Sequence, residues 1–171
     1  METWDAIRSR RNTREYSDKP VAREDLERIL EAGRRAPSST NWQPWDFVVV
    51  TARDKLQALS EVWQGAGHVA TSQATIAVIA PAEETDFSRQ YLLYDLGQAT
   101  ALMTVAAADL GIGTAHAASK NQDVARKVLG LPDDKVCAFV LSVGYPADRP
   151  LAPVQNPERR PFEEVVHWSR W

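Results

Sequence analysis

The sequence predicts helices packed around one sheet, as in α+β and α/β folds. Short apolar runs alternate along the chain with segments of helical periodicity, which is typical of such folds. The length of 171 residues fits one domain, and it suffices to bury a core without a disulfide or a metal. A hydrophobic content of 44% and a charged content of 25% are ordinary for a globular protein.

The first half of the chain is expected to alternate between helix and strand. A short helix over residues 4–8 precedes an extended segment, and Pro20 then begins a helix whose Leu26 and Ile29 fall on one face with helical spacing. That helix ends at Ala36-Pro37, because the residue before a proline avoids helical backbone angles. A turn follows, and then a buried strand, a short amphipathic helix and a second strand are expected at residues 47–50, 56–62 and 75–79.

The longest expected helix runs from about Ser88 to Leu110. Between Leu96 and Ala108 it carries no charged side chain. A helix that is apolar all round is buried on all sides, and a partner chain is one way to bury it in a domain of this size. The glycines of Gly111-Ile112-Gly113 end this helix.

The remaining elements are one helix, one strand and a tail. Asn121 caps a helix that ends at Gly130, and residues 136–143 read as a third strand. Repeated prolines after residue 146 favour an extended tail. Residues 163–168 are expected to close the chain as a short strand or helix.

Composition excludes several classes of protein. The formal net charge of -3 and the pI of about 5.6 argue against a nucleic-acid-binding surface over the whole chain. The single Cys137 lies in an apolar run, so an intrachain disulfide is impossible and a reducing, cytoplasmic setting is expected. Neither a signal peptide nor a membrane span is expected. The scattered histidines and carboxylates do not have metal-ligand spacing.

Arginines gather near both ends of this acidic chain, at Arg8, Arg10, Arg11 and Arg14 and at Arg159-Arg160. A guanidinium group presents donors in a rigid fork that matches phosphate geometry. Convergence of the two clusters on one phosphate-bearing ligand is one interpretation. A solvated basic surface is the other, and the residues alone favour neither.

Two further segments are candidates for ligand contacts. Residues 36–45 place small hydroxyl side chains and an amide between two prolines, although the residues alone favour a structural turn before a strand. Residues 111–118 are small enough for a flat ligand to approach the backbone, and a plain connector is the alternative. His116 in this segment is either an acid or an ordinary structural histidine.

Together these segments resemble the FMN-dependent nitroreductase family over nearly the whole chain. The resemblance rests on the order and spacing of five motifs. These are Ile7-x-x-Arg10-Arg11-x-x-Arg14, the Ala36–Trp45 segment, Asp95 with the Leu110–Thr114 turn, Leu129-Gly130-Leu131-Pro132 leading to Val143-Gly144-Tyr145-Pro146, and the closing Arg159–Val166 segment.

The resemblance implies an α+β fold with a mixed sheet and an intertwined homodimer that holds FMN at the subunit interface. It implies one domain over residues 1–171, whose tail (about 147–171) extends over the partner. It also implies that the cofactor-binding residues are Arg10, Arg11, Asn12, Arg14, Pro37, Ser38, Ser39, Asn41, Thr114, Ala115, His116, Ala117, Arg159 and Arg160, with Gln64 and His68 as further candidates. Pro37 to Asn41 would come from the partner subunit, and Asn12 stands where the family usually has serine.

The activity implied is an FMN-dependent oxidoreductase that takes hydride from NAD(P)H. It would reduce nitroaromatic, quinone or related small-molecule acceptors by a ping-pong mechanism. Because the flavin performs the chemistry, no protein side chain is expected to be catalytic. The alternatives are reductive dehalogenation, flavin fragmentation and a flavin-holding protein without turnover. Nucleic-acid binding by the arginine arm is a further alternative.

Overall fold

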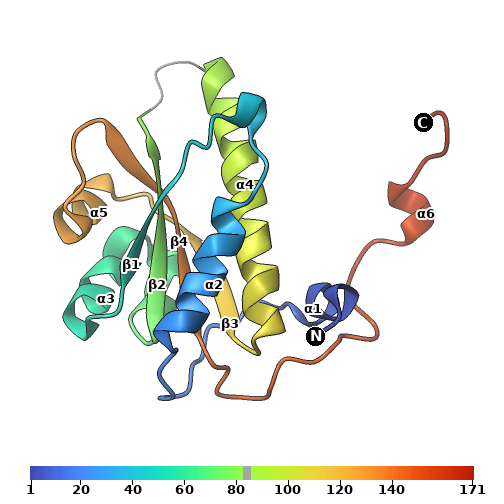
Figure 1. Ribbon diagram of the computed structural model, residues 1–171, viewed down its shortest axis with the longest axis horizontal. Helices are drawn as coiled ribbons and strands as arrows, with labels where there is room; N and C mark the ends of the chain where they lie inside the picture. Colours follow the sequence, from blue (N-terminus) through green and yellow to red (C-terminus); the bar gives the residue numbers. More distant parts are fainter. Residues whose placement is uncertain (83–85) are drawn as a thin grey trace.

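The computed structural model describes residues 1–82 and 86–171, and it has one four-stranded sheet between two layers of helices (Figure 1). The strand order is β1-β2-β4-β3, and the three neighbouring pairs are antiparallel. Among the described residues, a parallel pairing occurs only at the bridge between Asn12 and Thr114. The α+β fold class is confirmed, but the four strands pair antiparallel rather than as the mixed sheet that was expected, and the parallel contact is an isolated bridge. The strands are β1 (Asp46–Val50), β2 (Ala74–Pro81), β3 (Gly113–Ala118) and β4 (Lys135–Gly144).

Helices α2 (Arg23–Arg34) and α4 (Asp86–Asp109) cover one face of the sheet. Leu26 and Ile29 point from α2 into this core, as the helical spacing predicts. A Cβ atom at Gly33 would lie 2.8 Å from Cγ of Met103, so glycine allows the two helices to approach closely. Helix α1 (Thr3–Ser9) lies at the C-terminal end of α4.

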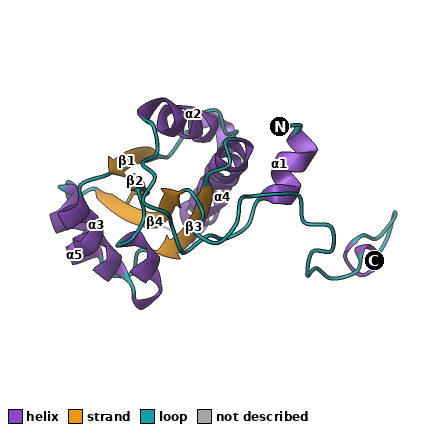
Figure 2. Ribbon diagram, turned by 90° about the horizontal axis from the view of Figure 1, so that it is seen from below, coloured by secondary structure: helices purple, strands orange, loops and turns teal. Residues whose placement is uncertain are grey.

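Helices α3 (Arg53–Leu59) and α5 (Gln122–Leu129) cover the opposite face, together with 3₁₀ turns at Ser60–Val62 and Gln64–Val69 (Figure 2). Both predicted ends of α5 are confirmed. Asn121 accepts a hydrogen bond from the backbone N–H of Val124, and Gly130 takes a left-handed conformation with φ of 69°.

Two strands differ from the expectation. Residues 47–50 form a strand as predicted, but it is not buried, because β1 is at the edge of the sheet and only Val50 of its residues is buried. Residues 113–118, for which a ligand-contact segment and a plain connector were the two interpretations, form β3. Their alanine-rich sequence has low β-propensity. They become a strand because β4 pairs with them from Gly113 opposite Gly144 to Ala118 opposite Phe139.

The face of α4 that looks away from the sheet is open, so this helix is not buried on all sides within one chain. Tyr94 is 67% exposed and Leu102 is 40% exposed. The tail, with α6 (Phe162–Val165), stands away from the rest of the chain, and Trp168 and Trp171 at its end are exposed (Figure 2). Helix α4 is nevertheless not a membrane span, since no helix in the described ranges combines the necessary length and apolarity.

Candidate functional site

Residues 10–14, called the arginine segment below, follow α1 and are extended. They lie between β3 and the start of the tail. The backbone N–H of Thr13 donates to the carbonyl of Thr114 over 2.9 Å, on the open edge of β3. On the other side, the N–H of Val154 donates to the carbonyl of Arg8 over 3.1 Å. Parts of the chain that are far apart in sequence are thereby held side by side.

A cavity of about 590 Å³ opens between α1, the arginine segment and the tail. Trp4 and Ile7 of α1 form part of its apolar wall. Its polar lining includes Arg10, Arg11, Asn12 and Arg159. The structure therefore places side chains from both arginine clusters around one hollow. Arg160 does not line this cavity; it donates instead to the carbonyl of Glu164 over 2.9 Å.

The arginines of the cavity differ in their partners. Arg11 donates to the carboxylate of Asp148 over 2.7 Å and to the carbonyl of Arg149 over 3.0 Å, so it anchors the tail. Hydrogen bonding to Arg11 is also the main cause that lowers the pKa of Asp148. Within the described ranges, no ion pair engages Arg10 or Arg159. Arg159 donates one hydrogen bond to the carbonyl of Glu158 over 2.6 Å, so Arg10 and the remaining N–H groups of Arg159 are available to an anion.

The predicted contact segment of β3 presents one prominent side chain. Thr114, Ala115 and Ala117 are buried, whereas His116 is exposed. The protein atoms around the ring remove part of its hydration even though the side chain reaches the surface, which lowers the pKa of His116, and the positive charge of Arg10 lowers it further. His116 therefore lies within the electrostatic reach of the arginine cavity.

A buried polar network fastens the arginine segment to the sheet. Nδ1 of His68 lies 2.7 Å from Oγ of Ser142, which lies 2.6 Å from the hydroxyl of Tyr16. Burial lowers the pKa of His68, and the charge of Arg14 acts in the same direction. Burial also raises the pKa of Tyr16. Both groups are consequently neutral near pH 7, and His68 is buried within the electrostatic reach of Arg14.

No local sequence pattern identifies Tyr16 or Ser142 as site residues. Their partners come from three separate parts of the chain, so no local spacing reveals the network. The other mid-chain candidate, Gln64, is exposed at the start of its 3₁₀ turn. A Cβ atom at Gly144 would lie 2.7 Å from the ring of Tyr16, so this glycine makes room for the tyrosine.

The second part of the candidate site is the loop between α2 and β1. The backbone N–H of Ser39 donates to Oδ2 of Asp95 over 2.9 Å, and its hydroxyl donates to Oδ1 over 3.2 Å. The hydroxyl of Ser38 accepts from the N–H of Gln43 over 2.8 Å. The carbonyl of Pro37 accepts from the side chain of a glutamine on α4. Asn41, also predicted, is exposed.

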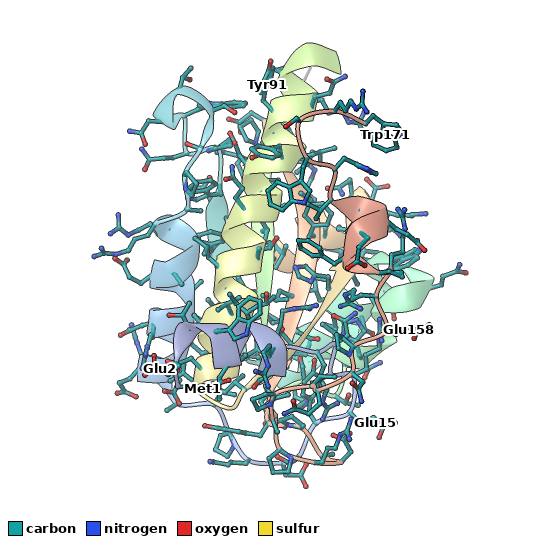
Figure 3. All side chains as sticks on the ribbon, turned by 90° about the vertical axis from the view of Figure 1, so that its right-hand side faces the viewer. Met1, Glu2, Glu15, Tyr91, Glu158 and Trp171 are labelled. Atoms are coloured by element: carbon teal, nitrogen blue, oxygen red, sulfur yellow. The ribbon has the colours of Figure 1, made fainter. Side chains whose placement is uncertain are left out.

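These two parts lie at different heights along α4. The loop contacts α4 at Asp95, whereas the amino group of Met1 lies 2.5 Å from Asp109 at the far end. Fourteen helical residues separate these contacts, which corresponds to about 21 Å along the axis. Figure 3 shows Met1 and Tyr91 towards opposite ends of the helix. A single chain therefore does not bring the 37–41 loop to the arginine cavity.

The described residues contain no group of three or more histidine, cysteine or acidic side chains placed to hold a metal ion. Positive charge at the candidate site comes from guanidinium groups instead. Two of them, Arg10 and Arg159, face the same cavity from opposite ends of the sequence.

Comparison with known proteins assigns the family. A sequence profile described as the Nitroreductase family matches residues 7–81 and 58–145. An Archaeoglobus fulgidus protein, provisionally named NADH dehydrogenase/NAD(P)H nitroreductase, is 35% identical over an alignment of 169 residues that covers 96% of each chain. A Clostridium acetobutylicum structure, provisionally named NADH oxidase, has a TM-score of 0.85 at 26% identity and covers 98% of this chain and 100% of its own. An FMN-dependent nitroreductase from Clostridium difficile has a TM-score of 0.83 at 25% identity, with 97% and 98% covered. The chain therefore belongs to the nitroreductase family.

Proposed function

We propose that this protein is an FMN-dependent oxidoreductase that takes hydride from NADH or NADPH and reduces nitroaromatic, quinone or related acceptors in the cytoplasm. The observation that carries the proposal is the convergence of Arg10, Asn12 and Arg159 on one cavity in a nitroreductase-family chain. The names of the relatives support the cofactors, since one is called an NAD(P)H nitroreductase and another an FMN-dependent nitroreductase.

The donor groups of the cavity fit the phosphate of a mononucleotide. Arg10 and Arg159 offer guanidinium groups without ion-pair partners among the described residues, and Asn12 adds an amide donor. Each charge-assisted hydrogen bond contributes about 1.5–3 kcal/mol. The volume of about 590 Å³ lies within the range typical of small-molecule sites.

The other residues would hold and orient the flavin ring. FMN, when bound, accepts hydride from the nicotinamide and passes it to the second substrate. Arg14 would direct its positive charge at the pyrimidine side of the ring, where negative charge accumulates. The small side chains of residues 114–117 let a flat ligand approach the backbone of β3. No protein acid or nucleophile is required, and the two substrates would use one site in turn.

The assembled protein would be a homodimer with residues 1–171 as one domain in each subunit. Three observations support this arrangement. Tyr94 and Leu102 expose an apolar face of α4, and the tail beyond residue 154 ends in exposed tryptophans. The 37–41 loop also lies about 21 Å along α4 from the α1 contact at Asp109. A second copy would supply that loop to the cavity and would bury the tail (about 147–171).

The visible spectrum of the purified protein tests the proposal, before and after mixing with NADH or NADPH in a stopped-flow instrument. Flavin absorption that bleaches with a nicotinamide and returns with a nitroaromatic or quinone is expected, with parallel double-reciprocal plots. A preparation that stays colourless after incubation with FMN would contradict it. Bound flavin that neither nicotinamide bleaches would indicate a holding role, and steeply salt-dependent DNA affinity would indicate nucleic-acid binding.

A further inference from the structure

Asp95 is a fully buried carboxylate on α4, with an exposed fraction of 0%. It accepts two hydrogen bonds from Ser39, at 2.9 Å and 3.2 Å, and one from Gln98 at 3.4 Å. No lysine or arginine in the described ranges forms an ion pair with it. A buried carboxylate is unfavourable unless hydrogen bonds replace its water. The contact with Ser39 is therefore its principal compensation.

The loop that Asp95 holds has an unusual backbone. Thr40, Asn41 and Gln43 have φ values of 53°, 59° and 53°, a region that residues other than glycine seldom occupy. Such conformations persist only where surrounding contacts impose them. Ser38 closes the loop through Gln43, and Asp95 fixes its base through Ser39.

We propose that Asp95 is a positioning residue that keeps the 38–43 loop in the shape that completes the flavin site of the partner chain. This inference rests on the proposed function. Because the hydroxyls of Ser38 and Ser39 are already engaged within their own chain, the loop presents backbone groups and the Asn41 amide to the partner. Asp95 touches neither flavin nor substrate, and it acts through Ser39.

Flavin-free protein provides the first test. Asp95→Leu replaces the carboxylate by an apolar side chain of similar shape and removes the acceptor of both Ser39 donors. Asp95→Asn keeps an acceptor for the N–H of Ser39. Thr100→Val is the matched control, since the Thr100 hydroxyl is buried on the same helix and, among the described residues, bonds to backbone carbonyls of α4. Hydrogen exchange of the Ser39 amide should accelerate about tenfold or more in the leucine variant alone.

The second test is the affinity for FMN. The dissociation constant should rise roughly 10- to 150-fold in Asp95→Leu, which corresponds to one lost hydrogen bond to a charged acceptor. It should be largely restored in Asp95→Asn, with an unfolding temperature close to wild type. The unfolding temperature of Asp95→Leu should fall modestly, because the half-buried Ser39 loses its acceptor. Unchanged exchange, or unchanged FMN affinity despite faster exchange, would overturn the inference. Equal losses of stability and of FMN affinity in Asp95→Leu, Asp95→Asn and Thr100→Val would also overturn the inference.

Mixed dimers test the assignment to the partner. A dimer of one Asp95→Leu chain and one Arg10→Ala chain should contain one intact site and recover about half of the wild-type flavin content. No recovery would overturn the assignment. If wild-type protein bound no FMN, the proposed function would fail, while the exchange experiment would still decide whether Asp95 holds the loop. If Asp95→Leu does not fold, Ser39→Ala replaces it, and faster exchange of residues 39–43 is expected.

Discussion

Replacement of Arg10 by alanine should release FMN and leave the fold intact. Arg10 follows the last residue of α1 and lines the cavity. Among the described residues it has no ion pair, so its removal leaves no carboxylate without a partner. The backbone bond from its N–H to the carbonyl of Ala6 does not depend on the side chain.

The expected loss follows from one hydrogen bond to a charged group. Such a bond contributes about 1.5–3 kcal/mol, and a factor of ten in affinity corresponds to about 1.4 kcal/mol. The dissociation constant for FMN should therefore rise about 10- to 150-fold. The charge of Arg10 is also the second cause, after burial, that lowers the pKa of His116. The pKa of His116 should consequently rise in the variant, even without flavin.

Two measurements check this prediction. Fluorescence titration with FMN at fixed ionic strength gives the affinity, and an NMR titration of His116 gives its pKa. Arg160→Ala is the control, because Arg160 does not line the cavity and bonds to Glu164 within the tail. Full flavin content in the purified Arg10→Ala protein, with the same pKa for His116, would refute the reasoning.

Three further predictions concern pH, packing and the tail. The pKa of His68 is lowered in the folded chain, so the unfolded chain takes up the proton first as the pH falls. The free energy of unfolding should therefore have its full value above pH 6.5, the ordinary pKa of histidine, and decrease below it. Urea unfolding at pH 5.5 and 7.5 should show a smaller difference for His68→Gln, and an equal difference would argue against this origin. Gln122→Ala should lower the unfolding temperature, because it leaves the buried backbone N–H and carbonyl of Cys137 without their partners at 3.0 Å and 2.8 Å, and each such loss costs about 1–3 kcal/mol. Gln57→Ala is the control, because Gln57 is exposed. Equal unfolding temperatures of the two variants in calorimetry would contradict the stabilising role of Gln122. Truncation before Arg159 should weaken flavin retention and dimerisation together, and a truncated protein that stays yellow and dimeric in sedimentation would exclude that role.

Local signals were sufficient for several elements. Asn121 and Gly130 located the two ends of α5. The Asn121 side chain accepts a hydrogen bond from an N–H of the first turn, and Gly130 takes the left-handed conformation that ends the helix, so both signals act over a few residues. The spacing of Leu26 and Ile29 identified the buried face of α2 for the same reason. The thiol of Cys137 is buried as expected, and burial raises its pKa to about 11.

The candidate site was only partly readable from the sequence. The two arginine clusters were recognised as candidates, but their partners were not: Arg11 binds Asp148, whereas Arg10 and Arg159 stay available. Asp95 was noted only as a motif position. Its place next to the charge-free stretch of α4 was the available signal, since a carboxylate in such a helix needs a specific partner.

The sequence by itself determined the helices, two of the buried strands and the side chains suited to phosphate, since these depend on residue type and short-range spacing. The tertiary structure decided that the alanine-rich residues 113–118 form a strand, that Tyr16, His68 and Ser142 share one network, and that the loop held by Asp95 lies far from the arginine cavity. The physical reason is that strand pairing and buried hydrogen bonds join residues that are distant in sequence. Whether such partners meet depends on the packing of the whole chain.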